Sequence, residues 1–138
     1  MVHKVKKSEL PEVAKLMIQE LSKEPFEEKE EKDAVIKSLE YYHQNSEVIG
    51  TTEQGDFQGI LVFKQEMWWQ GSVYIIENLI AKQEEQRAIL LQYLHKSAKK
   101  ENVQKTIFST HKSSPNLSYY ENRGYKPNES IVVYEKEL

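Results

Sequence analysis

The sequence predicts one α/β domain over residues 1–138, of the α+β kind, with its elements in the order β-α-α-β-β-β-α-β-α-β. Three observations predict this class. Apolar residues recur at helical spacing within residues 10–21 and 84–100. From Glu47 onward the pattern changes to short alternating runs separated by turns that contain glycine. Val73–Ala81 is a nearly continuous apolar run, which is typical of an interior strand covered on both faces.

The first third of the chain predicts a strand followed by two helices. Val2–Val5 alternates as a short strand, and Ser8 is placed to cap a helix with Pro11 in its first turn, where a missing N–H costs little. The buried stripe of this helix comprises Leu10, Val13, Met17 and Leu21. Lys23–Lys32 is rich in charge and is expected to be a solvated connection. A second helix, ending near residue 45, buries Val35, Leu39 and Tyr42.

The middle of the chain predicts two successive hairpins and a third helix. Val48–Glu53 and Phe57–Gln65 are joined by a turn at Gly55-Asp56, and a second turn at Gln70-Gly71 leads into the apolar strand. The third helix runs over Glu84–Lys100. Its inward residues are Leu90 or Leu91, Leu94 and Ala98.

The last third predicts strand, short helix and strand. Thr106–Thr110 is the first of these strands, and Ile131–Tyr134 is the last. Between them, Pro115 fits the entry of a short helix and Gly124 fits its left-handed exit. A turn around Pro127-Asn128 then leads into the final strand.

Composition excludes several classes of function. A formal net charge of -3 argues against nucleic-acid binding, which needs a concentrated basic face. The chain has no cysteine, so it has no disulfide, thiol nucleophile or thiolate metal site. No apolar run reaches about 18 residues, and the start lacks an apolar signal core, so we expect a cytoplasmic protein without membrane contact.

Two segments resemble a known family. Tyr119-Tyr120, three residues, then Gly124-Tyr125 resembles the "fYxxxGF" signature of the GNAT (N-acetyltransferase) superfamily, and Ile76–Ala81 resembles its "IxNLxV" strand. The resemblance implies a mixed, strongly bent sheet flanked by helices. It also implies an acyl-CoA-dependent N-acyltransferase, with acetyl-CoA as co-substrate, in which a primary amine of a small molecule or peptide attacks the thioester directly.

The resemblance also implies a place for the coenzyme. In the family, the strand equivalent to Val73–Ala81 carries a bulge and splays from the next strand, and the pantetheine arm pairs with the freed backbone. The matching residues are Leu79, Ile80 and Ala81, acting through the main chain. The alternative is an ordinary strand in a fully paired sheet.

The family's pyrophosphate-binding loop is degenerate in this chain. Relatives carry a glycine-rich loop before the third helix, whereas this chain has Lys82–Ala88 without glycine. The matching positions are Gln86, Arg87 and Ala88 if Gln86 replaces the first glycine. Alignment on the two leucines of the helix instead puts Glu85 and Arg87 at the glycine positions, and ungapped alignment on Ala81 moves those positions into the helix. Glu84 and Glu85 would compete with a phosphate, so the segment also fits an ordinary first helical turn.

Tyr120 and Glu77 are the candidate catalytic residues. By resemblance, Tyr120 donates a proton to the coenzyme A thiolate; register against Gly124 selects it over Tyr119. Glu77 lies in an apolar strand and is either a base for the acceptor amine or a residue facing a solvated groove. Asn116, one turn before Tyr120, either contacts the coenzyme arm or caps the helix.

Other residues leave the function open. Trp68-Trp69 would wall an acceptor pocket, anchor a homodimer or cover the sheet. The four histidines lack metal-ligand spacing, so no metal is expected, and His111 and Lys112 are cleft candidates only by position. The degenerate loop favours a catalytically inactive GNAT-fold binding or regulatory module, and the tyrosine motif favours the enzyme. A third alternative is a small interaction domain that dimerises through the tryptophans.

Overall fold

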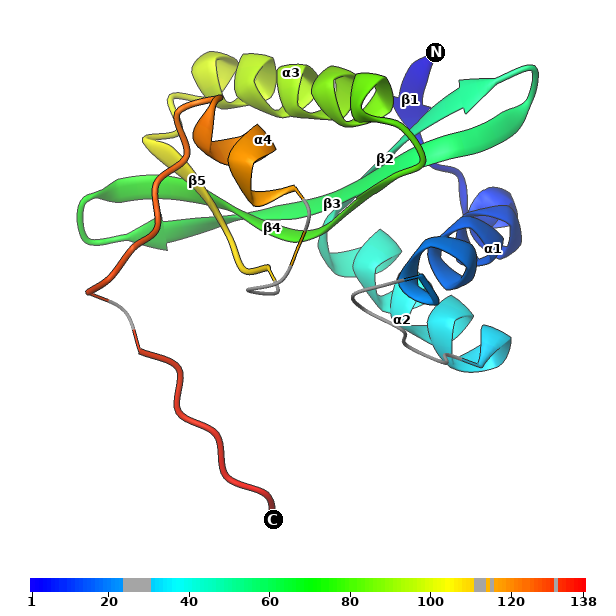
Figure 1. Ribbon diagram of the computed structural model, residues 1–138, viewed down its shortest axis with the longest axis horizontal. Coiled ribbons are helices and arrows are strands. Elements are labelled where there is room, and N and C mark those ends of the chain that lie inside the picture. The colour runs from blue at the N-terminus through cyan, green and yellow to red at the C-terminus, as the bar shows by residue number, and fades with distance from the viewer. Residues whose placement is uncertain (24–30, 111–113, 115, 131) are drawn as a thin grey trace.

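A computed structural model describes residues 1–23, 31–110, 114, 116–130 and 132–138. The described strands form one mixed sheet in the order β1-β2-β3-β4-β5 (Figure 1). They are β1 (Val2–Lys4), β2 (Glu47–Glu53), β3 (Asp56–Trp68), β4 (Gly71–Ala81) and β5 (Lys105–Phe108). Neighbours from β1 to β4 pair antiparallel, whereas β4 and β5 pair parallel. The predicted α/β class is confirmed.

Helices cover both faces of this sheet (Figure 1). A short 3-10 turn, η1 (Lys7–Glu9), precedes α1 (Leu10–Leu21) and α2 (Lys32–Asn45), whose apolar stripes pack on one face together with Ile60 and Val62 of β3. The other face carries α3 (Glu84–Lys100) and α4 (Leu117–Glu121), packed with Leu61 and Phe63 of the same strand. Alternate residues of β3 therefore contribute to two cores, as the strand period requires.

The N-cap of the first helix and the turn of the first hairpin each lie one residue away from the predicted position. Ser8 lies inside η1 and does not cap α1; the N-cap is Glu9, whose carboxylate accepts the Lys6 N–H at 2.9 Å. The turn between β2 and β3 consists of Gln54 and Gly55, with φ of 51° and 85°. Both residues need positive φ, which is the requirement of the tight two-residue hairpin turn.

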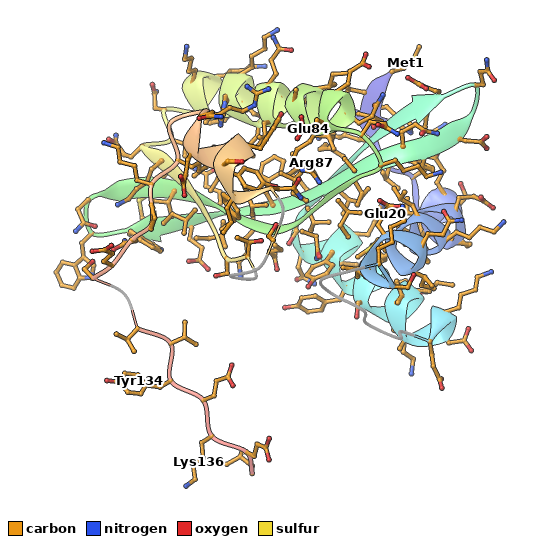
Figure 2. All side chains as sticks on the ribbon, viewed as in Figure 1. Met1, Glu20, Glu84, Arg87, Tyr134 and Lys136 are labelled. Carbon is orange, nitrogen blue, oxygen red and sulfur yellow. The ribbon has the colours of Figure 1, made fainter. Side chains whose placement is uncertain are left out.

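The predicted final strand is not formed over residues 132–134. Val132, Val133 and Tyr134 are 67%, 75% and 91% exposed and belong to no strand, and the labelled Tyr134 lies away from the body of the fold (Figure 2). Their residue types favour a strand, but a strand also needs a neighbour, and β5 pairs only with β4 in the described chain. Ile131 and most of the Lys23–Lys32 connection lie outside the described residues.

Strand β4 is interior, but its partner β5 accompanies only its first half. The parallel ladder joins Val73–Ile76 to Lys105–Phe108, and β4 then continues to Ala81. On its other side β4 stays paired with β3 up to Ala81, with a bulge at which Ile76 faces Phe63 and Asn78 faces Val62. Glu77 is the extra residue of this bulge. β5, predicted to reach residue 110, ends at Phe108 and leads away from β4 (Figure 1).

Candidate functional site

The divergence of β4 and β5 defines the centre of the candidate site, here called the β4–β5 gap. One side is the β4 segment from Glu77 to Ala81, and the other is the end of β5 at Phe108. Leu79 and Ala81 pair with β3 residues Leu61 and Gly59, and β5 does not reach their free edge. Backbone N–H and C=O groups on an unpaired strand edge can bind an extended ligand as an added strand.

Glu77 is placed by the bulge on the face that α1 and α2 cover. Its carboxylate Oε1 accepts a hydrogen bond of 2.5 Å from the Ser46 hydroxyl, at the C-terminal end of α2. The same carboxylate lines a surface hollow with Tyr41 and Tyr42 of α2. Sequence reasoning missed Ser46, because only the fold brings the end of α2 to β4.

Tyr120 lies on the opposite face of the sheet, on α4. Its side chain is buried, at 7% exposure, and its ring centroid lies 4.6 Å from that of Phe108 and 6.0 Å from that of Tyr125. Burial raises the pKa of the Tyr120 phenol, while the positive charge of the Arg87 guanidinium lowers it. Because burial is the larger effect, the phenol stays protonated at neutral pH and can donate a proton.

Tyr119 is the neighbouring phenol, set at an interplanar angle of 88° to Tyr120. Its hydroxyl is buried and has no hydrogen-bond partner among the described residues. The Arg123 guanidinium lies 4.2 Å from its ring centroid, within the range of a cation–π contact. Tyr119 is therefore held through its ring rather than through its hydroxyl, as far as the described residues show.

Of the predicted loop residues, Arg87 is the one that contacts the cluster around Tyr120. Arg87 is 7% exposed, and its side chain lies between α3 and the strands (Figure 2). Nη1 donates to the Asn116 side-chain oxygen at 3.3 Å, and the guanidinium carbon lies 5.9 Å from the Tyr119 ring centroid. Nε has no partner among the described residues. Arg87, Asn116, Tyr119 and Tyr120 therefore form one cluster beside the β4–β5 gap.

The other two predicted loop residues lie in different surroundings. The Gln86 amide is buried and donates to the Glu53 carboxylate of β2 at 3.1 Å, whereas Ala88 is half-buried and lines a surface hollow with Asn122 and Arg123 at the end of α4. Glu84 and Glu85 are exposed. The N-cap residue of α3 makes no side-chain capping bond, and the Gln86 and Arg87 N–H groups donate to the Gln83 carbonyl at 3.1 and 3.2 Å. The N–H groups of Glu84 and Glu85, at the very start of the helix, therefore remain for water or a ligand.

A polar network that the sequence did not predict joins α3, β5 and the chain after α4. The Tyr125 hydroxyl lies 2.8 Å from both His95 Nε2 and Thr106 Oγ1. Burial, together with the charges of Lys99 and Arg123, lowers the pKa of His95, so His95 is neutral at pH 7. Burial raises the pKa of Tyr125. Of these three residues, the sequence had pointed only to Tyr125, as the last residue of the tyrosine motif.

The remaining candidates lie apart from this cluster. Trp68 and Trp69 occupy the β3–β4 turn at the opposite end of β4 from Ala81, where Trp69 is fully exposed. His111 and Lys112 lie outside the described residues. Within the described ranges, no three histidine, aspartate or glutamate side chains are grouped closely enough to hold a metal ion. No helix in these ranges is both long and apolar enough to span a membrane.

Solved structures share this architecture over the whole chain. A possible acetyltransferase from Clostridium difficile 630 is 17% identical with a TM-score of 0.77, and the match covers 100% of this chain and 97% of that one. AAC(6')-Iy in complex with the bisubstrate analogue CoA-S-monomethyl-acetylneamine is 13% identical with a TM-score of 0.77, covering 100% and 98%. The chain has the GNAT acetyltransferase fold. The structure of a transcriptional regulator from Bacillus halodurans C-125 is also similar, at 16% identity and a TM-score of 0.77. The match covers 100% of this chain and 99% of that one.

The GNAT fold is thus established by structure at low sequence identity. No family model matches the sequence, and no curated protein matches it. This GNAT-fold chain combines three features: strands β4 and β5 that diverge, a bulge at Glu77, and the two tyrosines of α4. The fold sets Glu77 and Tyr120 on opposite faces of the sheet, on either side of β4.

Proposed function

We propose that this protein is an acyl-CoA-dependent N-acyltransferase that transfers an acetyl group from acetyl-CoA to a primary amine by direct attack on the thioester. The observation that supports it best is the β4–β5 gap beside a buried tyrosine, Tyr120, that stays protonated at neutral pH. The acceptor is a small molecule or a peptide. The 138 residues act as one GNAT-like domain in the cytoplasm.

The chain offers polar groups that fit a coenzyme A ligand. The backbone of Leu79, Ile80 and Ala81 would pair with the pantetheine arm along the edge that β5 leaves free. The start of α3 near Gln86, Arg87 and Ala88 would lie against the pyrophosphate. Because the Gln86 and Arg87 N–H groups already donate to the Gln83 carbonyl, the backbone donors would be the N–H groups of Glu84 and Glu85. Two buried polar atoms, Arg87 Nε and the Tyr119 hydroxyl, lack protein partners among the described residues, which is expected where a polar ligand binds.

The side chains then have separate roles in the transfer. Glu77 accepts a proton from the acceptor amine, directly or through water, because an amine is mostly protonated near neutral pH. Tyr120 gives its proton to the sulfur as the carbon–sulfur bond breaks. Since the two side chains lie on opposite faces of the sheet, they meet one substrate only through the β4–β5 gap. Asn116 holds Arg87 beside that gap through its side-chain oxygen.

The second candidate function is a catalytically inactive GNAT-fold module that binds a partner or regulates. The loop without glycine and the exposed acids Glu84 and Glu85 favour it, because both weaken a phosphate site. A transcriptional regulator shares the fold, so the fold is compatible with either role. The fully exposed Trp69 at the hairpin tip would suit such a module by pairing two copies of the chain.

Calorimetric titration with acetyl-CoA and, separately, with coenzyme A separates the two candidates. The enzyme requires a measurable micromolar to high-micromolar signal, and the absence of binding at millimolar coenzyme A refutes it in favour of the module. With an amine acceptor found by screening, Tyr120→Phe is expected to lower kcat at least ten-fold, the usual scale for loss of a general acid. Tyr119→Phe is the matched control, and a loss confined to the Tyr119 variant would show that the register against Gly124 is wrong.

A further inference from the structure

Arg87 stands out as a charge on the buried stripe of α3. The inward residues of this helix are Gln86, Arg87, Leu90, Leu91, Leu94 and Ala98. Arg87 precedes Leu90 by three positions and Leu91 by four, so it occupies the same face as the apolar core residues. Arginine is rarely buried without a paired carboxylate, and within the described part of the chain Arg87 forms no salt bridge.

The surroundings of Arg87 are the phenols and amide of α4 rather than an acid. Asn116 fixes one end of the guanidinium at 3.3 Å, and the Tyr119 ring lies beneath it at 5.9 Å. Tyr119 and Tyr120 are adjacent, with ring centroids 5.7 Å apart. Tyr120 thus adjoins the ring that Arg87 contacts, and the charge of Arg87 lowers the pKa of the Tyr120 phenol in a buried site, where charge interactions are stronger than in water.

We propose that Arg87 is a positioning residue for acyl transfer: its guanidinium orients the Tyr120 hydroxyl and stabilises the phenolate that forms when Tyr120 gives up its proton. The inference rests on the proposed function, which supplies the thioester. It deepens that function, because Tyr120 must lose a proton in an apolar site and recover it in every turnover. A fixed positive charge lowers the cost of that charged state without moving during the reaction.

In the transfer step, the amine nitrogen forms a bond to the carbonyl carbon, the carbon–sulfur bond breaks, and its electron pair stays on sulfur. The Tyr120 proton moves to sulfur and gives the thiol. The phenolate is held by Arg87 until the proton released by the amine nitrogen reaches it, by way of Glu77 or water. Amine and thioester are converted to amide and thiol, and no further reactant is needed.

The effect of Arg87 on the pKa of Tyr120 can be measured without any substrate. Tyrosine labelled with ¹³C at Cζ reports phenol ionisation by NMR, with Tyr120 assigned from Tyr120→Phe and Tyr125 from Tyr125→Phe. Arg87→Met is expected to raise the apparent pKa of Tyr120 by about one unit, the scale for removal of a nearby opposite charge. Arg87→Lys keeps the charge and is expected to restore most of the parent titration.

Tyr125 is the internal control for this titration. Its phenol is half-buried in the same aromatic cluster, but its hydroxyl contacts Thr106 and His95. The groups that act on the Tyr120 phenol are Arg87 from α3 and Tyr119 and Tyr125 from α4 and the chain after it. A shift of Tyr120 alone supports the proposal. An unmoved Tyr120, or equal shifts of both phenols through a general change of packing, overturns it.

Kinetics provide the second arm, on an acceptor found by screening. Arg87→Met is expected to lower kcat about ten-fold in the parent and to have little further effect in Tyr120→Phe, since the two residues would act as a unit. Equal losses in both backgrounds, or a rise in KM for acetyl-CoA with kcat unchanged, would assign Arg87 to binding and overturn the proposal. If no amine is acetylated while Tyr120 alone still shifts, the enzyme function fails and the coupling between Arg87 and Tyr120 stands.

Discussion

Arg87→Met is expected to make the folded protein more stable. Arg87 is 7% exposed, donates one hydrogen bond of 3.3 Å to Asn116 and leaves Nε unpaired within the described chain. Loss of that bond costs about 1 kcal/mol. Removal of a buried charge recovers a desolvation penalty of about several kcal/mol, part of which the Tyr119 ring already offsets. We expect a net gain in the free energy of unfolding of about 1–2 kcal/mol, because methionine fills a similar length with apolar atoms.

Urea unfolding followed by the fluorescence of Trp68 and Trp69 measures this gain. The midpoint should rise with an unchanged m value, and the melting temperature should rise by about 3–8 °C. Arg123→Met is the matched control, since Arg123 is exposed and also lies over Tyr119, at 4.2 Å; its loss should leave stability nearly unchanged. If Arg87→Met lowers the free energy of unfolding by more than about 1 kcal/mol, Arg87 is an ordinary satisfied structural residue and the reasoning is refuted.

Three further outcomes are expected. Changing Glu84 and Glu85 together to Gln should strengthen coenzyme A binding several-fold in calorimetry, with a smaller gain at high salt; no gain would mean that the exposed acids do not face the ligand. The folded-state pKa of His95 is lowered, so its neutral form stabilises the fold above its ordinary pKa, near 6.5, and that stability is lost as pH falls through the folded-state pKa. His95→Gln should therefore flatten the fall of the urea midpoint between about pH 7 and pH 5, and an unchanged slope would exclude His95 as its source. Gly50→Ala should destabilise by about 1–3 kcal/mol, because a Cβ there would lie 2.6 Å from the Phe57 ring; an unchanged urea midpoint would show that the ring moves aside freely.

Most of the fold could be predicted because its cues are local. The bounds of α3, Glu84–Lys100, agree with the prediction, since an apolar stripe and acids at the start are all within the helix itself. The final strand failed for the opposite reason. Its residue types favour a strand, but its formation depends on a neighbour that no local pattern specifies, and Val132–Tyr134 remain exposed.

The candidate site was predicted less completely than the fold. Glu77 and Tyr120 were found as single residues, because an acid in an apolar strand and a tyrosine motif are visible in sequence. Their partners Ser46 and Arg87 come from other elements. Arg87 nevertheless carried a readable indication, since its spacing to the leucines of α3 places it inside. Arg87 was predicted as a residue of the pyrophosphate loop, whereas the structure places it among the buried residues of α3.

The first turn of α3 carries acidic side chains that face solvent and one basic side chain that faces the interior. This arrangement bears on whether an anion can bind there without the glycine loop. Glu84 and Glu85 are exposed, so water and salt screen them, whereas Arg87 is buried, where its field is stronger at the same distance. An anion in the β4–β5 gap would therefore experience mainly Arg87 and the first amides of the helix. In the proposed enzyme, the Arg87 side chain would supply positive charge where the glycine loop is missing, and its place in the cluster with Tyr120 would tie anion recognition to the proposed proton donor.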